Sequence, residues 1–332
     1  MLEHVTAEST WNEIISRTEF AGFSPFLLSN CYVPDLNWTL KQMNEAFYDW
    51  GADSIAYGLN RIIDLIDAGE QAAFDFYSAD EREVSPDKQE TKLFFMRGKP
   101  GKPFVMICPG GGYGAVCTLK EGFTTGARLN EYGYNAFILS YRLRARSAES
   151  TYSLMPKPID DLAAAMRFIK NHEQEFGVTM DRYGIAGFSS GGHLAGEWGT
   201  VNAGAVRYGL PRPELEILIY PASDTTEFRM FNGRNILLEG MLGSAYTQED
   251  VDFYNVNAHI DKEYPATYLM HCIDDPIVPF RTSEKMKEEL EKNGRPYRLN
   301  AVQRGGHGFG LGEGSEAEGW IEDALKFWEE YR

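Results

Sequence analysis

Residues 183–201 of the chain read YGIAGFSSGGHLAGEWGTV. A short apolar run leads into the pentapeptide GFSSG at 187–191, and a segment compatible with a helix follows from Gly192. This is the pattern G-x-S-x-G at a strand-to-helix turn, where the central serine takes up a strained backbone conformation. Glycines on both sides of the serine remove the Cβ atoms that would collide at such a turn. The pattern predicts that the hydroxyl of Ser189 stands clear of a sheet and acts as a nucleophile.

The composition is that of a protein with a large core and a strongly negative overall charge. Of the 332 residues, 43% are apolar, and the formal net charge is −17. This length allows one large α/β domain with an appendage, or two domains. The charge argues against nucleic acid and against an anionic membrane as partners, because both bind basic patches.

The four cysteines are scattered and do not have the spacing of metal ligands: Cys31, Cys108, Cys117 and Cys272. Cys108 and Cys272 fall in apolar runs and are expected to be buried as small hydrophobic residues. The chain shows no signal-peptide pattern at its start and no apolar run of membrane length. The expected location is therefore the cytoplasm, and no metal site is predicted.

Residues 1–72 differ from the rest and are expected to form an N-terminal helical extension. One helix is predicted from an Asn37 cap through Trp50, and another from a Ser54 cap to Gly69. The second helix carries an apolar stripe: Ile55, Leu59, Ile62, Ile63 and Ile66. Such a stripe predicts packing against the main domain or in a homodimer, with a wall of the substrate pocket as the third alternative.

Residues 73–332 alternate between short apolar runs and helical patterns, which predicts a single α/β domain. The expected strands are Ala73–Tyr77, Lys92–Arg97, Pro103–Cys108, Asn135–Tyr141, Tyr183–Gly187, Leu215–Tyr220, Ala266–Cys272 and Tyr297–Val302. The expected helices are Leu119–Tyr132, Ile159–Phe176, Gly192–Val201, Arg281–Asn293 and Glu316–Tyr331. The first two strands should form an antiparallel hairpin through Ser85-Pro86-Asp87, and the others a mostly parallel twisted sheet with helices on both faces. Ligands bind such sheets beyond the carboxyl ends of the strands.

The strand at 103–108 ends in PGGGYG at 109–114, for which two functions compete. Gly110, Gly112 and Ala115 satisfy the dinucleotide pattern G-x-G-x-x-A, but that pattern also needs an acidic residue at the end of the next strand. That strand ends in Ser-Tyr-Arg at 140–142, without a carboxylate. The other function is an oxyanion loop, whose bare amides face the carbonyl oxygen of a bound ester. The serine turn downstream favours the oxyanion loop.

The segment 215–265 is longer than a strand-to-helix connection requires. It carries several aromatic and apolar residues: Phe228, Met230, Phe231, Leu237, Leu238 and Met241. The sequence leaves two alternatives open for this segment: a cap over the strand ends, or a long surface loop that packs against the domain.

Two further strand ends carry the groups that would activate a nucleophilic serine. The seventh strand ends in Asp274-Asp275, and the eighth leads to His307 between glycines. Of the six histidines, only His307 follows an acid at a strand end, which gives the order Ser…Asp…His. Asp275 is preferred as the acid because D-x-x-V-P places its side chain at the exit of the strand, and Asp274 is expected to be a solvated neighbour. Asp224, after the sixth strand, is the alternative acid.

Four motifs in this order, PGGGYG, GFSSGGH, DDPIVP and GGHGFG, resemble those of the α/β-hydrolase superfamily. Within it, residues 73–332 look most like the PGGGY-type acetyl esterases and acetylxylan-esterase-like carboxylesterases. The resemblance implies that Ser189 is the nucleophile, Asp275 the acid and His307 the base. It also implies an oxyanion hole formed by Gly111, Gly112 and the amide of Ser190.

The sequence therefore predicts a serine carboxylesterase that hydrolyses short-chain acetyl esters of a sugar or oligosaccharide through an acyl-enzyme, without a cofactor. A peptidase or amidase with the same triad and a non-catalytic binding protein of the same fold are the alternatives. A protein that binds NADP through the glycine loop and Arg142 or Arg144 is a more distant one. The expected partner is a small acetylated carbohydrate.

Overall fold

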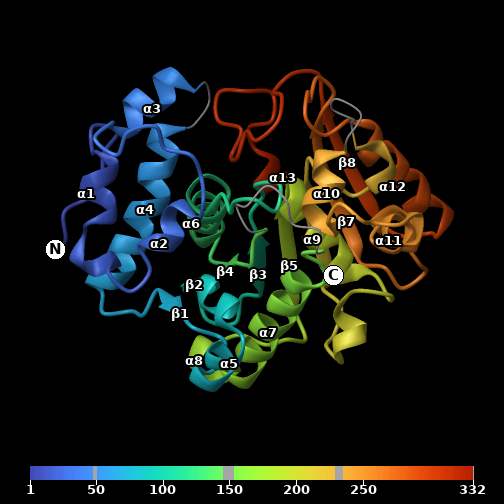
Figure 1. The fold of residues 1–332 in the computed structure, drawn as a ribbon, viewed down its shortest axis with the longest axis horizontal. Coiled ribbons are helices and arrows are strands. Elements are labelled where there is room, and N and C mark those ends of the chain that lie inside the picture. The colour runs from blue at the N-terminus through green and yellow to red at the C-terminus, as the bar shows by residue number, and fades with distance from the viewer. Residues whose placement is uncertain (48–50, 145–152, 229–234, 332) are drawn as a thin grey trace.

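The computed structural model describes residues 1–47, 51–144, 153–228 and 235–331. Its centre is an eight-stranded sheet in the order β1-β2-β4-β3-β5-β6-β7-β8 (Figure 1). The strands are β1 (Ala73–Phe74), β2 (Lys92–Met96), β3 (Phe104–Cys108), β4 (Asn135–Ser140), β5 (Tyr183–Phe188), β6 (Leu215–Ile219), β7 (Ala266–Cys272) and β8 (Tyr297–Val302). Strand β2 pairs antiparallel with both of its neighbours, and the six strands β3 to β8 are mutually parallel. The predicted mostly parallel sheet is confirmed.

Thirteen α-helices are assigned within the described residues. They are α1 (Trp11–Ile15), α2 (Pro25–Leu28), α3 (Leu40–Ala46), α4 (Ala52–Asp67), α5 (Ala79–Val84), α6 (Thr124–Glu131), α7 (Lys157–Asn171), α8 (Glu173–Phe176), α9 (Ser189–Gly199), α10 (Ile236–Leu242), α11 (Gln248–Phe253), α12 (Arg281–Lys292) and α13 (Trp320–Glu330). Short 3-10 turns are η1 (Thr18–Phe20), η2 (Pro86–Glu90), η4 (Ala205–Tyr208), η5 (Thr225–Glu227) and η6 (Val256–His259), and η3 (Thr118–Phe123) is a π-helical turn.

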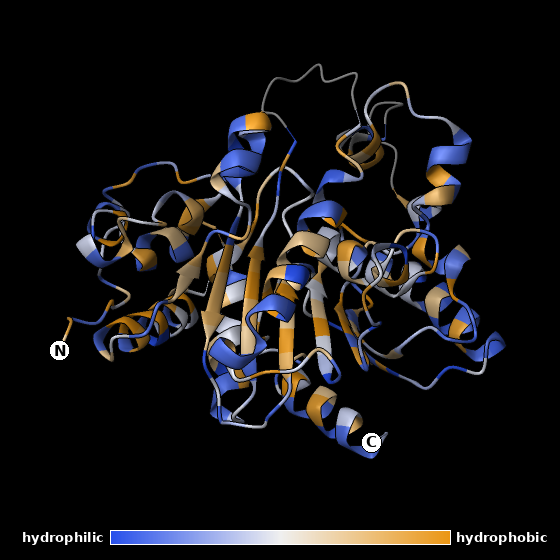
Figure 2. Ribbon diagram, turned by 90° about the horizontal axis from the view of Figure 1, so that it is seen from below, coloured by the Kyte–Doolittle hydropathy of each residue, from blue (hydrophilic) through white to orange (hydrophobic). Residues whose placement is uncertain are grey.

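Helices cover both faces of the sheet and give two hydrophobic cores. Helices α7, α9 and α12 pack on one face, and α6 and α13 pack on the other, with α4 outside α6. Every residue of the strands β2 to β7 is buried, because a sheet covered on both faces has no polar side. Figure 2 shows these strands as a largely hydrophobic centre. The edge strand β8 is mostly half-buried, which explains its polar residues.

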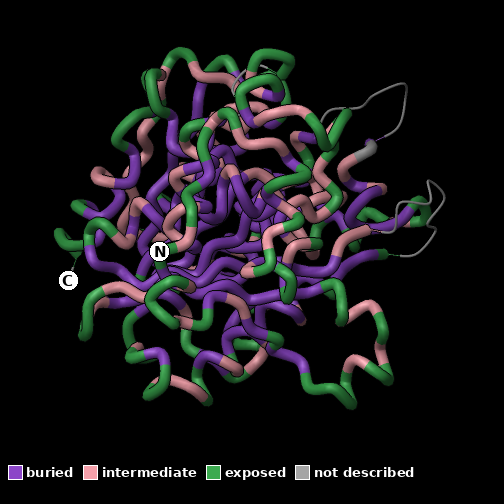
Figure 3. The backbone as a smooth tube through the Cα atoms, turned by 90° about the vertical axis from the view of Figure 1, so that its left-hand side faces the viewer, coloured by how far each residue is buried: buried purple, intermediate pink, exposed green. Residues whose placement is uncertain are grey.

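The N-terminal segment packs beside the sheet on the α6 side. Helix α4 contacts both α6 and the turn η3, and it buries Ile55, Leu59, Ile62, Ile63 and Leu65. Ile66, which belongs to the predicted stripe, is only partly buried. In Figure 3, which views the molecule from this side, buried backbone forms the interior and exposed stretches lie at the periphery.

Several predicted helix boundaries were wrong for local reasons. Helix α3 starts after Thr39, not Asn37, because Thr39 and Gln42 form a reciprocal capping box. Trp50, its predicted end, lies outside the described residues, and α4 begins at Ala52 after Gly51 without a Ser54 cap. The predicted helix from 119 begins as the π-helical turn η3 and continues as α6.

The connection between the first two strands was also predicted incompletely. Strands β1 and β2 are antiparallel, as expected, but the residues between them fold into α5 and η2. Ser78 and Glu81 form a capping box that starts α5, which is a local signal for a helix in this stretch. The element is therefore a strand pair with a helical connection.

Candidate active site

The serine turn has the strained geometry that its glycines suggest. Strand β5 ends at Phe188, and α9 begins directly at Ser189, three residues earlier than predicted from the sequence. Ser189 has φ +52°, a left-handed value that is costly for a residue with a side chain. A Cβ on Gly187 would lie 2.2 Å from the carbonyl oxygen of Gly191, and one on Gly191 would lie 2.1 Å from that of Cys108. No side chain fits at either position, so the turn requires both glycines.

The three residues predicted as a catalytic triad lie in one chain of contacts. His307 Nε2 is 2.9 Å from Ser189 Oγ, and His307 Nδ1 is 2.6 Å from Asp275 Oδ2. We assign the tautomer in which Nδ1–H donates to the carboxylate and Nε2 accepts from the serine hydroxyl. The His307 side chain is 15% exposed, whereas that of Asp275 is fully buried. This is the arrangement that activates a serine hydroxyl by general-base catalysis.

Asp275 is held as a carboxylate by three hydrogen-bond donors and by the nearby imidazole of His271. Its Oδ1 accepts from the backbone N–H groups of Ile277 and Val278 at 2.8 and 2.9 Å. Its Oδ2 lies near two imidazoles, His307 and, at 3.2 Å, Nε2 of His271. Burial opposes the charge, but the hydrogen bonds, largest from His271 and His307, lower the pKa of Asp275 to about 2.

The other two carboxylates considered from the sequence have different partners. Asp224 is buried and receives hydrogen bonds from Thr226 and Asn255, with the ammonium of Lys285 at 3.0 Å. Asp274 is exposed, but it is more than a solvated neighbour, because its Oδ1 accepts from the backbone N–H groups of Gly305 and Gly306 at 3.1 and 2.9 Å. Asp274 therefore anchors the loop that carries His307.

The glycine loop after β3 turns its backbone toward Ser189. Gly111, Gly112 and Tyr113 all have positive φ, at 132°, 62° and 57°. A Cβ on Gly111 would lie 2.2 Å from the carbonyl oxygen of Ala115, so this position requires glycine. Gly111, Gly112, Ser189 and Ser190 line one cavity. The amide of Ser190 is in the first turn of α9, where backbone N–H groups have no partner within the helix.

A buried carboxylate, Glu121 of the turn η3, supports this loop from behind. Its Oε2 accepts from the backbone N–H of Gly110 at 2.6 Å, and its Oε1 accepts from the hydroxyl of Tyr220 at 2.8 Å. Burial raises the pKa of Glu121, against the effect of these hydrogen bonds. The ring of Tyr220 in turn lies 4.6 Å, centroid to centroid, from the imidazole of His307. Glu121 thus links the glycine loop to the surroundings of the histidine.

A buried histidine, His193, fixes the side chain of Tyr113 in the glycine loop. The Tyr113 hydroxyl lies 2.8 Å from His193 Nδ1, and His193 Nε2 lies 2.8 Å from the carbonyl oxygen of Tyr254. Burial lowers the pKa of His193 to about 4, so it is neutral near pH 7. Nε2–H then donates to the carbonyl, and Nδ1 accepts from the tyrosine.

Ser189 and His307 open into a cavity of about 630 Å³. Its walls come from several parts of the chain and are mainly apolar. The N-terminal segment contributes Leu27, Leu28, Cys31 and Phe47, and the segment after β6 contributes Phe228, Leu237 and Met241. The long segment 215–265 therefore caps the strand ends with these residues, while its Met230 and Phe231 lie outside the described part of the chain. Residues of segment 1–72 thus line the cavity, as in the third alternative predicted for that segment, a wall of the substrate pocket.

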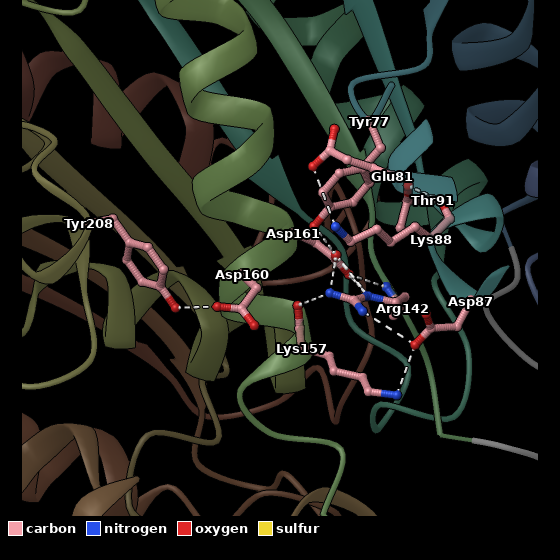
Figure 4. A network of polar contacts seen from close by, with 10 residues as sticks. All are labelled: Tyr77, Glu81, Asp87, Lys88, Thr91, Arg142, Lys157, Asp160, Asp161 and Tyr208. Carbon is pink, nitrogen blue, oxygen red and sulfur yellow. Dashed lines mark hydrogen bonds and ion pairs between the residues drawn. The ribbon is translucent and has the colours of Figure 1, made fainter. Parts of the chain in front are cut away.

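Arg142 lies in a network of polar contacts that runs from buried Asp161 to the partly exposed Asp87 and Lys157 (Figure 4). Its guanidinium contacts Asp161 at 2.8 Å and Asp87 at 3.2 Å, and Lys157 contacts Asp87 at 2.8 Å. Tyr77 donates to the same Asp161. Arg142 therefore cross-links β4, α7 and η2, and is not available to bind the phosphate of a dinucleotide.

Within the described residues there is neither a cluster of metal ligands nor a helix that could span a membrane. Over 1–47, 51–144, 153–228 and 235–331, no group of three or more His, Cys, Asp or Glu side chains is arranged to hold a metal ion. In the same ranges, no helix has both the length and the apolar composition that a membrane span requires.

Residues 96–290, more than half of the chain, match the sequence profile of the BD-FAE family. The chain belongs to the BD-FAE family. Its sheet order and its likeness to solved structures confirm the α/β-hydrolase fold.

In sequence, the chain is similar to an acetylxylan esterase of Xylanibacter ruminicola, with 26% identity over 230 residues, 69% of this chain. Endo-1,4-beta-xylanase B of Butyrivibrio fibrisolvens is 25% identical over 223 residues, 65% of this chain. The chain spans only 45% and 34% of the length of these two relatives. A solved structure, an acetyl ester-xyloside bifunctional hydrolase of Caldicellulosiruptor lactoaceticus, superimposes with a TM-score of 0.66 at 25% identity, covering 78% of this chain and 96% of that one.

Sequence reasoning missed three residues that surround this site: His271, Glu121 and His193. His271 lies within β7, and Asp275 follows it by four positions, but a histidine inside an apolar strand gives no sign of its partner. Glu121 follows Lys120 in the mixed stretch TLKEGF at 118–123, and nothing in that pattern marks it as buried. His193 follows the serine turn directly, and that spacing is the one signal that pointed to it.

Proposed function

We propose that this protein is a serine carboxylesterase that hydrolyses short-chain, acetyl esters of a sugar or oligosaccharide. The observation that carries the proposal is the chain of contacts from Ser189 through His307 to Asp275, with distances of 2.9 and 2.6 Å, beside an apolar cavity. In this proposal Ser189 is the nucleophile, His307 the base and Asp275 the acid. The names of the relatives, an acetylxylan esterase and an acetyl ester-xyloside hydrolase, support the acetyl and sugar parts of the substrate.

The first half of the proposed reaction forms an acyl-enzyme. Ser189 Oγ attacks the ester carbonyl while its proton passes to His307 Nε2. The buried, ionised Asp275 stabilises the imidazolium that results, and it holds Nδ1–H so that Nε2 is free to accept the proton. His307 then returns the proton to the departing sugar oxygen, and the C–O bond breaks.

The negative charge that develops on the carbonyl oxygen needs fixed donors. We assign this role to the backbone N–H groups of Gly111, Gly112 and Ser190, which belong to residues lining the cavity beside Ser189. Glu121 fixes the preceding residue, Gly110, so the loop is held in place before substrate binds. Water then repeats the same steps on the acyl-enzyme and releases acetate.

The remaining expectations are part of the proposal. Residues 1–72 form an extension that supplies one wall of the pocket, and residues 73–332 form the catalytic domain. The substrate is an acetylated carbohydrate, and neither nucleic acid nor a membrane is a partner. A homodimer stays a prediction. A cytoplasmic location also stays a prediction, supported by four cysteines that are free thiols.

Acetate release from acetylated xylo-oligosaccharides tests this function. Ser189→Ala should lower kcat by about 10⁴-fold or more and abolish labelling by a fluorophosphonate, because only the nucleophile is lost. Ser190→Ala is the comparison variant: it keeps the backbone amide of the proposed oxyanion hole but removes the hydroxyl that accepts from the Tyr113 N–H at 3.4 Å, so it should lower kcat far less than Ser189→Ala. Near-wild-type hydrolysis by Ser189→Ala would overturn the proposal, and faster cleavage of aminoacyl nitroanilides than of nitrophenyl acetate would favour a peptidase.

A further inference from the structure

Two aromatic residues of the N-terminal segment stand at the mouth of the cavity. Tyr32 is 72% exposed, and Phe47 is 39% exposed. Their rings meet edge to face, with centroids 6.5 Å apart and planes at 89°. Phe47 also lines the cavity that contains Ser189 and His307, so the pair extends the apolar wall of the site outward to the surface. The pair therefore presents aromatic surface to the solvent at the edge of the cavity.

The segment that carries Tyr32 is attached to the loop after the glycine motif. The N–H of Val116 donates to the carbonyl oxygen of Ser29 at 3.1 Å, and the thiol of Cys31 lies 3.5 Å from the carbonyl oxygen of Val116. Cys31 lines the cavity and directly precedes Tyr32. Tyr32 is thus held near the active site by contacts with the loop that follows the glycines.

Phe47 is positioned by a separate element. It follows α3, and its N–H donates to the carbonyl oxygen of Met43. The reciprocal capping box of Thr39 and Gln42 fixes the start of that helix, and Met43 is buried. The two rings therefore come from two independently anchored pieces of chain. Ile277, of the loop after β7, also lines the cavity and is 53% exposed.

This surface matches the chemistry of a sugar ring. A pyranose presents an apolar C–H face that stacks on aromatic rings, while its hydroxyl groups stay in water at the rim. Tyrosine is suited to such a place because its ring is apolar and its hydroxyl remains solvated. When the acetyl group lies at Ser189, the sugar that carries it and the next sugars of the chain lie outside the cavity.

We propose that Tyr32 and Phe47 form a sugar-binding subsite that holds the carbohydrate chain of the substrate beyond the ring that carries the ester. This proposal rests on the proposed esterase function and adds that the N-terminal segment selects oligosaccharides over small esters. The subsite lies outside residues 96–290, the part matched by the BD-FAE family.

Kinetics on two substrates test the subsite. Tyr32→Ala and Phe47→Ala should each raise KM for an acetylated xylotetraose by about 3- to 10-fold, the effect of losing one aromatic contact. The kcat for that substrate should stay within about 2-fold in both variants. In Tyr32→Ala both constants for 4-nitrophenyl acetate should also stay within about 2-fold, since Tyr32 lies outside the residues that line the cavity. In that variant, an equal rise in KM for both substrates, or no rise for either, would overturn the subsite.

Tyr331→Ala is the matched control. Tyr331 is 54% exposed and also lies against a phenylalanine, Phe327, at a centroid distance of 4.7 Å. It follows α13, whose Trp328 donates to Glu214 just before β6 begins, at the amino-terminal ends of the parallel strands and so opposite the strand ends that carry Ser189. This variant should leave both substrates unaffected.

Binding of a sugar without an ester separates the subsite from catalysis. In the Ser189→Ala background, unacetylated xylotetraose should quench or shift protein fluorescence, and Tyr32→Ala should weaken that binding by a similar factor. Wild-type protein that hydrolyses neither substrate would refute the esterase function, whereas normal hydrolysis with no effect of either aromatic variant would refute only the subsite. A change in the solution mass of Tyr32→Ala, measured by light scattering, would show a protein interface instead and would also overturn it.

Discussion

Replacement of Asp275 by asparagine tests the proposed triad most directly, because the surrounding donors dictate how the new side chain must lie. Two backbone N–H groups donate to Oδ1, at 2.8 and 2.9 Å, so an asparagine will place its carbonyl oxygen there. Its NH₂ group then takes the place of Oδ2 and faces His307 Nδ1. Two donors cannot pair, so Nδ1 must become an acceptor and the proton moves to Nε2. In that tautomer Nε2 cannot accept the proton of Ser189.

The loss should be large. A wrong histidine tautomer of this kind costs about 10⁴-fold in kcat, which corresponds to about 5.5 kcal/mol of transition-state stabilisation. The assay is hydrolysis of 4-nitrophenyl acetate over a range of substrate concentrations, with thermal unfolding followed by circular dichroism to confirm that the variant is folded.

Two other asparagine variants serve as matched controls. Asp274→Asn keeps the Oδ1 acceptor for Gly305 and Gly306, so kcat should fall by less than about 10-fold. Asp224→Asn weakens the contact with Lys285 at 3.0 Å, so it should lower the free energy of unfolding and leave kcat nearly unchanged. If Asp224→Asn were the variant that loses four orders of magnitude and Asp275→Asn were mild, the assignment of the acid would be wrong.

Three further outcomes are expected. Activity on nitrophenyl esters should fall from acetate to octanoate, because Tyr113 and the glycine loop confine the acyl side; a steady rise would indicate a lipase-like site. A chain that begins at residue 73 should aggregate in size-exclusion chromatography or show a raised KM, because loss of α4 exposes the apolar surface of α6 and η3 that α4 covers. Unchanged solubility and an unchanged kcat/KM would show that residues 1–72 are a passive extension. His193 has a folded-state pKa of about 4 against an ordinary value of 6.5, so the unfolded state takes up a proton first as the pH falls, and the stabilising contribution of His193 is lost between those values. The difference in free energy of unfolding between the wild type and His193→Gln should therefore shrink by roughly 2–3 kcal/mol from pH 7 to pH 4.5 in urea titrations; a pH-independent difference would contradict the neutral histidine.

The sequence by itself determined the fold class and the chemical candidates, because both are written in local patterns. Apolar runs separated by helical periodicity gave the strands of the parallel sheet close to their observed bounds. The glycines at 187 and 191 predicted a turn that no side chain could occupy, since the required closeness of backbone atoms is a property of a few adjacent residues. The order of serine, acid and histidine along the chain pointed to the same fold.

Only the tertiary structure decided which groups meet, because those contacts join residues that are distant in the sequence. Asp224 and Asp275 both follow strands, but only Asp275 contacts His307, and Asp224 is occupied by Lys285. His271 contacts Asp275, and Glu121 accepts from the N–H of Gly110. Both side chains are buried, so they pair with these groups and not with water. The apolar stripe of α4 specifies that this face of the helix must be covered, but not which surface covers it. The structure shows that α4 packs on α6, and that segment 1–72 lines the cavity.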